Sequence, residues 1–427
     1  MGAAQSAGSV FSPLDEELAL LPGNLAPRQQ DHVVHLASWM PFKKAASMME
    51  KLLGVQISEE TARRLTQRMG AALEQAQTQE AQAPFQEAHE GEYLPEKMAF
   101  SADGAMVGLV HGEWAEVRTL VIGKIKEQAK KKKKPGSQEP RVGELSSFSR
   151  LVGAEKFCQL AEVEMRRRCV IQAKQVCAVM DGADWLQEFV DMHREDAVRI
   201  LDFPHAAEHV NSLLEALVKA GYTFPSQMLE RCLHVLKHRG PSFLLSQIDR
   251  LPPPLLEQNG IREQVGYLHK REALMQYPTF LKQGLPIGSG MVESANKLVV
   301  EARLKGAGMR WERKNVNKML TLRNGVCSDR WQATWQEAGL AVCQQQKQRR
   351  KERTERREEA KLLTCNPLLL ESPPLPPKAA ATPAPLPPVP PTPPATLPGS
   401  SRPSAHHPWK RSFRPGRVNS QKDFAKI

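Results

Sequence analysis

The 427-residue sequence lacks three features, each of which would assign it to a class of protein. No apolar run approaches the roughly 18 residues of a membrane-spanning helix, so we expect no membrane partner. The first residues show no basic stretch followed by an apolar one, and we therefore expect no signal peptide. The seven cysteines are scattered and form no C-x2-C pair, which disfavours both a disulfide framework and a zinc ribbon. Together these absences predict a cytoplasmic protein with free thiols.

The chain does carry a large excess of positive charge. Its 59 lysines and arginines outnumber 47 aspartates and glutamates, which gives a formal net charge of +12. Such an excess favours a polyanionic partner, and without a spanning segment that partner is expected to be nucleic acid.

Composition and periodicity divide the chain into segments. The predicted segments are a flexible arm (1–30), a helical domain (31–90), the first part of an α/β core (97–204), a helical insertion (205–285), a C-terminal helix region of the core (286–340), and a charged helix with a disordered proline-rich basic tail (344–427). Nearly half of the 33 prolines lie in residues 366–408, a composition typical of disorder or polyproline II.

The helical domain contains a candidate DNA-binding motif. Residues 31–53 have helical periodicity interrupted at Pro41, and Ser58 is placed to cap a second helix over 59–69. Two short helices joined at a glycine resemble a helix-turn-helix, whose second helix would enter the major groove. The residues of that helix expected to meet phosphates or bases are Arg63, Arg64 and Arg68. An ordinary helical hairpin explains the pattern equally well.

The α/β core is predicted from strand-like runs that end in acids. Two β-rich runs follow residue 97, and the Asp-Gly at 103–104 offers a hairpin turn between them. A buried strand ends at Asp181, and another over 198–201 ends at Asp202, with Pro204 opening the next helix. Glu293 lies on a later helix. Because ligands gather beyond the carboxyl ends of parallel strands, these acids are candidates for a site that holds Mg²⁺. Taken singly, each is as well explained as a turn or surface residue.

Four stretches together resemble a known family. They read SADGAMV, CAVMDGADW, LDFPHAAEHV and PIGSGMVESANKLVVEARLKGAGMRWERKNVNKMLTLRNG. They are similar to blocks of bacterial insertion-sequence transposases of the DDE class, and most similar to the ISKra-type group allied to the Mutator-like superfamily. The opening SPLDEELALLPG and the closing HPWKR are also similar to that group, so the resemblance covers nearly the whole chain.

The resemblance implies a fold, a reaction and its residues. The fold is an RNase H-like catalytic core, a mixed sheet flanked by helices, interrupted by a helical insertion. The implied catalytic and metal-binding triad is Asp103, Asp181 and Glu293, which would hold two Mg²⁺ ions, with Mn²⁺ as a substitute. We prefer Asp181 to Asp184 and Glu293 to Glu301 as the matching acids. An Asp-x2-His signature of the family matches Asp202 and His205, which are expected to support the active site.

The last block adds a basic stretch with an aromatic residue inside it. Such a stretch suits a DNA backbone and an unstacked base. The expected DNA-binding residues are Arg303, Lys305, Arg310, Trp311, Arg313 and Lys314. The alternative is that Trp311 belongs to the core and the basic groups are only solvated.

The expected function is that of a transposase. It would bind the terminal inverted repeats and target DNA as a homo-oligomer, hydrolyse a phosphodiester at the transposon end, and pass the freed 3′-hydroxyl to the target by the two-metal DDE mechanism. One alternative is an inactive DNA-binding regulator derived from a transposase. Another is a zinc hydrolase built on His205 and His209, which lacks the H-E-x-x-H pattern. We expect His209 to be a packed helix residue.

Overall fold

The computed structural model describes residues 25–83, 95–126 and 140–365. Its strands are β1 (Lys97–Gly108), β2 (Trp114–Lys126), β3 (Arg141–Arg150), β4 (Gln175–Met180) and β5 (Val198–Leu201). The helices of the first half are α2 (Pro27–Trp39), α3 (Phe42–Leu53), α4 (Glu59–Gln82), α5 (Ala154–Arg167), α6 (Asp184–Arg194) and α7 (Phe203–Lys219). Those of the second half are α8 (Met228–Arg239), α9 (Pro241–Ile248), α10 (Pro253–Leu256), α11 (Asn259–Lys270), α12 (Tyr277–Lys282), α13 (Gly290–Ala295), α14 (Ala302–Leu304), α15 (Arg313–Cys327) and α16 (Trp331–Cys365). Short 3-10 helices lie at Val110–Gly112 (η1) and Glu272–Met275 (η2), and a π-helix lies at Asn296–Glu301 (η3).

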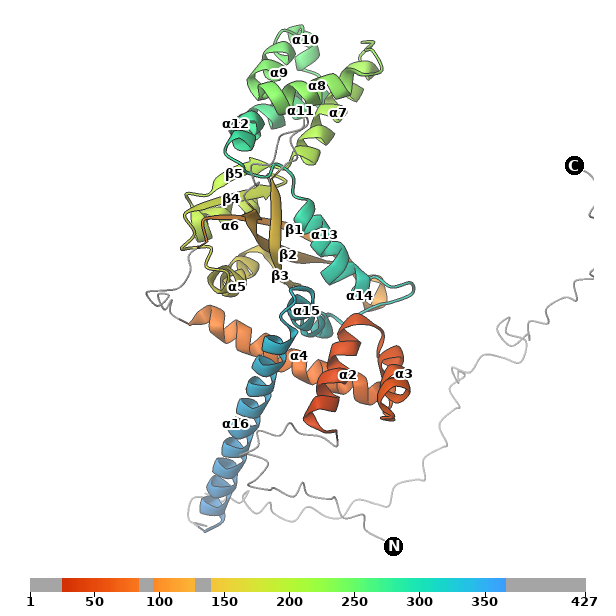
Figure 1. The fold of residues 1–427 in the computed structure, drawn as a ribbon, viewed down its shortest axis with the longest axis vertical. Coiled ribbons are helices and arrows are strands. Elements are labelled where there is room, and N and C mark those ends of the chain that lie inside the picture. The colour runs from red at the N-terminus through yellow and green to blue at the C-terminus, as the bar shows by residue number, and fades with distance from the viewer. Residues whose placement is uncertain (1–24, 84–94, 127–139, 366–427) are drawn as a thin grey trace, which may run out of the picture. The chain divides into compact units, whose positions relative to one another are not determined.

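The sheet is mixed, in the order β3-β2-β1-β4-β5. Strands β1, β2 and β3 pair antiparallel as a meander, whereas β4 and β5 run parallel to β1. Parallel neighbours need a crossover, and α5 and α6 provide the two crossovers of this sheet. The expectation of an α/β core with a mixed sheet flanked by helices is therefore confirmed (Figure 1).

Two details of this sheet differ from the sequence prediction. Strand β3 was not predicted, because its run of serines and its exposed first half lack strong apolar alternation. The Asp-Gly at 103–104 is not a hairpin turn, since Asp103 pairs with Thr119 in the middle of the β1–β2 ladder. The chain turns instead at residues 109–113, where His111 and Gly112 have positive φ angles. A turn dipeptide thus lies inside a strand because neighbouring strand pairing outweighs its local preference.

The two faces of the sheet pack against different helices. Alternate residues of β1 such as Met98 and Phe100 join the cluster that contains α5 and α6. On the opposite face, Ala99 packs in the cluster of the helical insertion, whereas Ala105 and Val107 pack in the cluster of α13 and α15. Two apolar clusters therefore share this face, and the residues of β1 between Ala99 and Ala105 lie where they meet.

The helical insertion is formed by α7 to α12 (Figure 1). Helix α7 begins at Phe203 immediately after β5, with Pro204 in its first turn as predicted. Its apolar stripe, including Leu213 and Leu217, packs with α8, α9 and α11 in a cluster that continues onto β4 and β5. The insertion is therefore anchored on the sheet through its own core.

The N-terminal helices are not separate from the core. Pro41 divides α2 from α3 and Ser58 Oγ accepts a hydrogen bond from Thr61 N at 3.1 Å, both as predicted. However, α4 is 24 residues long, which is longer than the predicted 59–69, and it packs along α15. Its Leu73 and Met69 share one cluster with Leu322 and Val342 of the C-terminal helices. Helix α2 also begins at Pro27, inside the segment predicted to be an arm.

The C-terminal boundary falls near residue 361. The described residues up to Lys361 form one compact unit. The predicted charged helix is the second half of α16, whose side chains are largely exposed between 349 and 361. The arm before residue 25 and the proline-rich tail lie outside the described residues. Among the helices described here, none has the length and apolar character needed to cross a membrane.

Candidate functional site

Asp103 and Asp181 come together because of strand register. The pairing of β1 with β4 runs from Lys97 opposite Gln175 to Phe100 opposite Ala178. Ser101 Oγ continues it by donating to Val179 O at 2.5 Å. The same offset brings Asp103 level with Asp181 on adjacent strands. Alternation then places both on the sheet face where the two apolar clusters meet.

Asp103 is half-buried, and its carboxylate has two hydrogen-bond donors. Gly104 N donates to Oδ1 at 2.7 Å, and Asn296 Nδ2 donates to Oδ2 at 3.0 Å. Burial raises the pKa of Asp103 above its ordinary value, and the charges of Asp181 and Glu116 raise it further, against the two hydrogen bonds. Like charges that share a site compete for ionisation, and a cation relieves that competition.

Asp181 lies in a loop that the helical insertion holds in place. Its Oδ1 accepts a hydrogen bond from Ala183 N at 2.9 Å, as the loop enters α6. Tyr267 Oη donates to the Asp181 carbonyl at 2.8 Å, and Arg271 Nη2 donates to Gly182 O at 2.7 Å. Gly182 has φ +81°, a conformation that glycine adopts without strain. Tyr267 and Arg271 were not predicted, because they lie 86 and 89 residues after the residues that they contact and show no local pattern.

Asp202 caps a helix and fixes the segment before α13. Parallel pairing of Met180 with Leu201 also places Asp202 level with Asp181. Its Oδ2 accepts from His205 N at 3.3 Å, and its Oδ1 accepts from Ser289 N at 2.6 Å. Burial raises the pKa of Asp202, while the Ser289 and His205 contacts lower it. The side chain supports the site by joining β5, α7 and the start of α13.

Glu293 is not beside the aspartates in this structure. Its segment is tied at both ends, by Ser289 to Asp202 and by Asn296 to Asp103, and Glu293 lies between these contacts. Its carboxylate is exposed and accepts from Lys297 Nζ at 2.6 Å, and this hydrogen bond lowers the pKa of Glu293. Within the described ranges, no three histidine, cysteine, aspartate or glutamate side chains converge as metal ligands. The predicted triad is thus represented by a converged pair and a displaced third acid.

Glu116 is an acid near Asp103 that the sequence did not suggest. It lies on β2, and the absent side chain of Gly104 leaves room for its carboxylate, because a Cβ there would collide with it. Arg118 Nη2 pairs with Glu116 at 2.6 Å and its guanidinium lies over the Trp185 ring at 5.3 Å. The strand-pairing register between β1 and β2 was needed to find this contact.

The two histidines of the insertion have different surroundings. His205 Nδ1 lies 3.6 Å from Glu208 Oε2, and its ring lies 4.9 Å from that of His209. The His209 ring stacks on Tyr267 at 3.5 Å, with its Nδ1 2.7 Å from Gln264 Oε1. Burial lowers the pKa of His209. His209 is therefore a packed residue, as expected, and it buttresses the tyrosine that holds the Asp181 loop.

The predicted DNA-binding residues divide into exposed and buried groups. Arg303 is 2% exposed, donates from Nε to Ala37 O at 2.9 Å, and lies over the Trp311 ring at 5.1 Å. Trp311 is itself 7% exposed and pairs through its backbone with Gly108 and Val110. Direct DNA contact by Arg303 and Trp311 is therefore incompatible with this structure, because both belong to the packing between α13, α15 and β1. Lys305 is partly buried and pairs with Glu301 at 2.6 Å.

The exposed basic residues come from two distant parts of the sequence. Arg310, Arg313 and Lys314 are exposed at the start of α15, and Arg64 is exposed on α4. The hydrogen bonds that Arg63 donates to Glu60 raise the pKa of Arg63. The charge of Glu312 also raises it, which indicates that the starts of α4 and α15 lie near each other. This basic surface consists of Arg63, Arg64, Arg310, Arg313 and Lys314. Arg68 lies deeper, where its Nη2 donates to Gln30 Oε1 at 3.2 Å.

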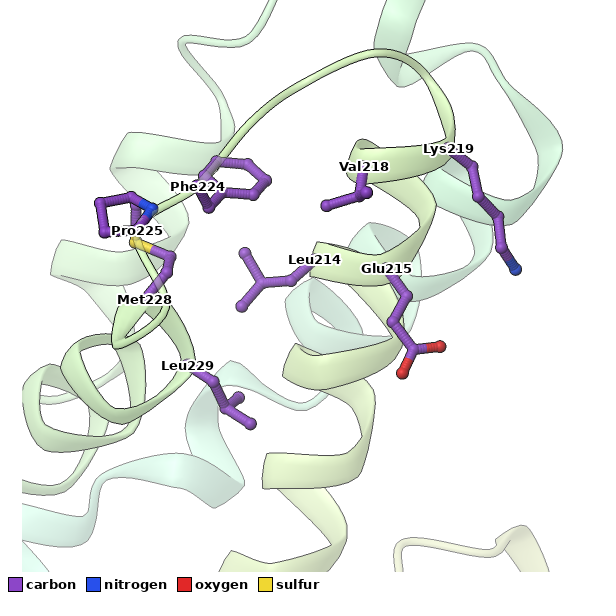
Figure 2. Close-up of a pocket in the computed structure, with 8 residues that line it drawn as sticks. All are labelled: Leu214, Glu215, Val218, Lys219, Phe224, Pro225, Met228 and Leu229. Carbon is purple, nitrogen blue, oxygen red and sulfur yellow. The ribbon is translucent and has the colours of Figure 1, made fainter.

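A separate hollow of about 430 Å³ lies in the helical insertion (Figure 2). Leu214 and Val218 of α7 face Phe224 and Leu229 across it. Its lining is mostly apolar and contains none of the predicted acids, so it is the outer edge of the insertion core and not part of the aspartate site.

Comparison with known proteins leaves the family unassigned. No protein-family model matches the chain, and no curated protein sequence matches it.

Proposed function

We propose that this protein is a transposase that binds transposon ends and target DNA, and cuts and joins strands with Mg²⁺ at the aspartate site. The observation that carries the proposal is the register that sets Asp103 level with Asp181, on adjacent strands and with interacting charges. The mixed sheet flanked by helices and the insertion before α13 are the architecture that the resemblance implies, and they support the RNase H-like assignment.

The donor set around the two aspartates fits a hard cation. Carboxylate and amide oxygens are the ligands that Mg²⁺ takes in proteins, and Asn296 adds a buried amide to the pair. Bound there, Mg²⁺ would stabilise the charge that develops on phosphoryl oxygens. A cation bound there would favour the charged form of Asp103, against the burial and the Asp181 charge that raise its pKa. Asp202 holds the α13 segment in place beside the pair.

The basic surface at the starts of α4 and α15 supports DNA binding. Its arginines and lysines contact phosphates without regard to sequence, and such contacts position a duplex. Helix α4, the second helix of the predicted helix-turn-helix, packs along α15 and is exposed in its first turns, so base reading by α4 would be limited to those turns. Mn²⁺ in place of Mg²⁺ is expected to support the same cleavage.

The test compares two aspartates three residues apart. Asp181→Asn should bind duplex DNA carrying the sequences that flank the coding region, yet lose Mg²⁺- or Mn²⁺-dependent nicking. Asp184→Asn is the matched control, because Asp184 is 84% exposed and pairs with Lys270 at 3.6 Å. Cleavage by Asp181→Asn at the wild-type rate would refute the proposed site.

One observation favours a second function, a DNA-binding regulator without cleavage activity. The third acid, Glu293, pairs with Lys297 and lies outside the aspartate pair. A protein of this kind would bind the same DNA through the basic surface and show no metal-dependent nicking in the wild-type form. Metal-dependent nicking by the wild-type protein in the experiment above separates the two functions.

A further inference from the structure

Asn296 has an unusual position in the fold. It is the first residue of the π-helix Asn296–Glu301, which directly follows α13. π-Helical turns are rare and are frequently found at functional sites. Ala295, Val299 and Val300 are buried around it, so the backbone of Asn296 is fixed against β1.

The amide of Asn296 is only half satisfied. The residue is 6% exposed, and its Nδ2 donates to Asp103 Oδ2 at 3.0 Å. Its Oδ1 is buried and has no hydrogen-bond partner among the described residues. Because both atoms belong to one planar amide, this oxygen lies close to the Asp103 carboxylate. A buried acceptor without a donor costs free energy, which a structural asparagine would avoid.

The other buried asparagines show the contrast. Asn324 uses both ends of its amide, with Oδ1 accepting from Ser149 N at 3.0 Å and Nδ2 donating to Ser149 O at 3.3 Å. Asn315 donates to Glu312 Oε2 at 2.9 Å, and its Oδ1 accepts from Lys318 Nζ at 2.9 Å. Among these three, Asn296 alone leaves its oxygen open, and it does so beside the paired aspartates.

We propose that Asn296 belongs to the cation site, where its amide orients Asp103 and its Oδ1 is an oxygen ligand for the cation held by Asp103 and Asp181. This inference rests on the proposed function and deepens it by naming a residue outside the predicted triad. An amide oxygen suits Mg²⁺ or Mn²⁺, and it adds no further negative charge to two carboxylates that already repel each other. Asn296 thereby adds a neutral oxygen to the two carboxylates in this structure, in which Glu293 pairs with Lys297.

The experiment measures Mn²⁺ binding by the full-length protein without DNA. Titration calorimetry and the rise in melting temperature with added Mn²⁺ are read for the wild type, Asn296→Ala, Asn296→Asp and the control Asn315→Ala. We expect Asn296→Ala to weaken Mn²⁺ affinity by about ten- to hundredfold, with a smaller Mn²⁺-induced rise in melting temperature. Asn296→Asp keeps an oxygen ligand and should bind Mn²⁺ more tightly than Asn296→Ala, and Asn315→Ala should bind as the wild type does.

The outcomes separate this inference from the proposed function. If Asn296→Ala binds Mn²⁺ as tightly as the wild type, Asn296 is not part of the site, whereas the proposed function stands as long as Asp181→Asn loses nicking. If the wild type binds no Mn²⁺ at millimolar concentration, the inference is overturned. If Asn296→Ala does not fold, Asn296→Asp and a further variant, Asn296→Ser, take its place. Weaker Mn²⁺ binding by folded Asn296→Asp than by the wild type then supports a role for the amide. Mn²⁺ binding equal to that of the wild type in both folded variants would overturn the inference.

Discussion

The sheet aspartates and the helical segment 290–314 were predicted to contribute to one site, but the two regions agree with that prediction to different degrees. On the sheet, Asp103 and Asp181 lie together as the strand pattern indicated. On the helical segment, Glu293 faces Lys297 and Arg303 is buried. Strand alternation has a period of two and is fixed by pairing, so the direction of a side chain follows from its position. A short helix followed by a π turn changes phase within a few residues, so the sequence pattern does not fix which residues face inwards.

The largest expected effect tests whether Glu293 acts with the sheet aspartates. Glu293→Gln should reduce metal-dependent nicking by roughly a thousandfold, because a triad acid contributes several kcal/mol of charge stabilisation through the cation. Its melting temperature should not change, since an exposed ion pair contributes little to stability. Nicking assays and thermal melts measure both. Wild-type nicking by Glu293→Gln would mean that the sheet acids work without the helix.

The next effect tests the burial of Trp311. Trp311→Ala should lower the free energy of unfolding by about 3–5 kcal/mol, the usual cost of truncating a buried tryptophan. Trp114→Ala is the matched control, because Trp114 is 57% exposed, and its cost should be within about 0.5 kcal/mol. Urea unfolding gives both values. A stable Trp311→Ala protein with weakened DNA binding would restore Trp311 as a DNA-contacting residue.

A smaller effect concerns the exposed basic residues of the same segment. Changing Arg313 and Lys314 together to alanine should reduce the slope of log affinity against log salt by about 1.8, as expected for two lost phosphate contacts. Melting temperature should stay constant, because both side chains are more than half exposed. Lys282→Ala, an exposed lysine of the insertion, is the control for overall charge. An unchanged salt slope would remove these residues from the DNA surface.

The smallest effect is on stability as a function of pH. The pKa of Asp103 is raised by burial, so the folded protein holds this proton at a pH where the unfolded chain has lost it. Stability is therefore favoured below the ordinary aspartate pKa and falls as the pH rises through the raised value. Asp103→Asn removes this loss and should melt at a higher temperature than the wild type at neutral pH, with the difference shrinking towards acid. Melts between pH 4 and 7 in chelator test this, and parallel curves would contradict it.

Much of the sheet could be predicted from the sequence, and the exceptions have physical causes. Strands β1, β2, β4 and β5 were predicted because their residues alternate or form apolar runs. Strand β3 was missed because a neighbouring strand supplies its stability, and the Asp-Gly at 103–104 was misread because pairing overrides turn preference. Neither signal exists in a single short stretch of sequence.

The candidate site divides in a similar way. Asp181 and Asp202 follow from their places at the ends of buried strands, whereas Asp103 was predicted as an acid of the site but lies inside β1 and not at its end. Asn296 and Tyr267 were not predicted, because each reaches the site from a different element and shows no local pattern. Glu116 was not predicted either, and it lies beside Gly104, on the sheet face opposite to Asp103. The pair of Glu293 with Lys297 has the i,i+4 spacing that the sequence itself shows, but its position outside the aspartate pair was decided by the tertiary structure.

The sequence by itself determined the alternation of strands and helices, the places of Asp181 and Asp202 after buried strands, and the excess of positive charge, because these depend on local periodicity and composition. The tertiary structure alone decided which acids meet, which basic residues stay in solvent, and where α4 packs. Those outcomes depend on strand register and helix phase, which are set by contacts between residues far apart in the chain. Asp103 and Asn296, 193 residues apart and joined by one hydrogen bond, show this dependence directly.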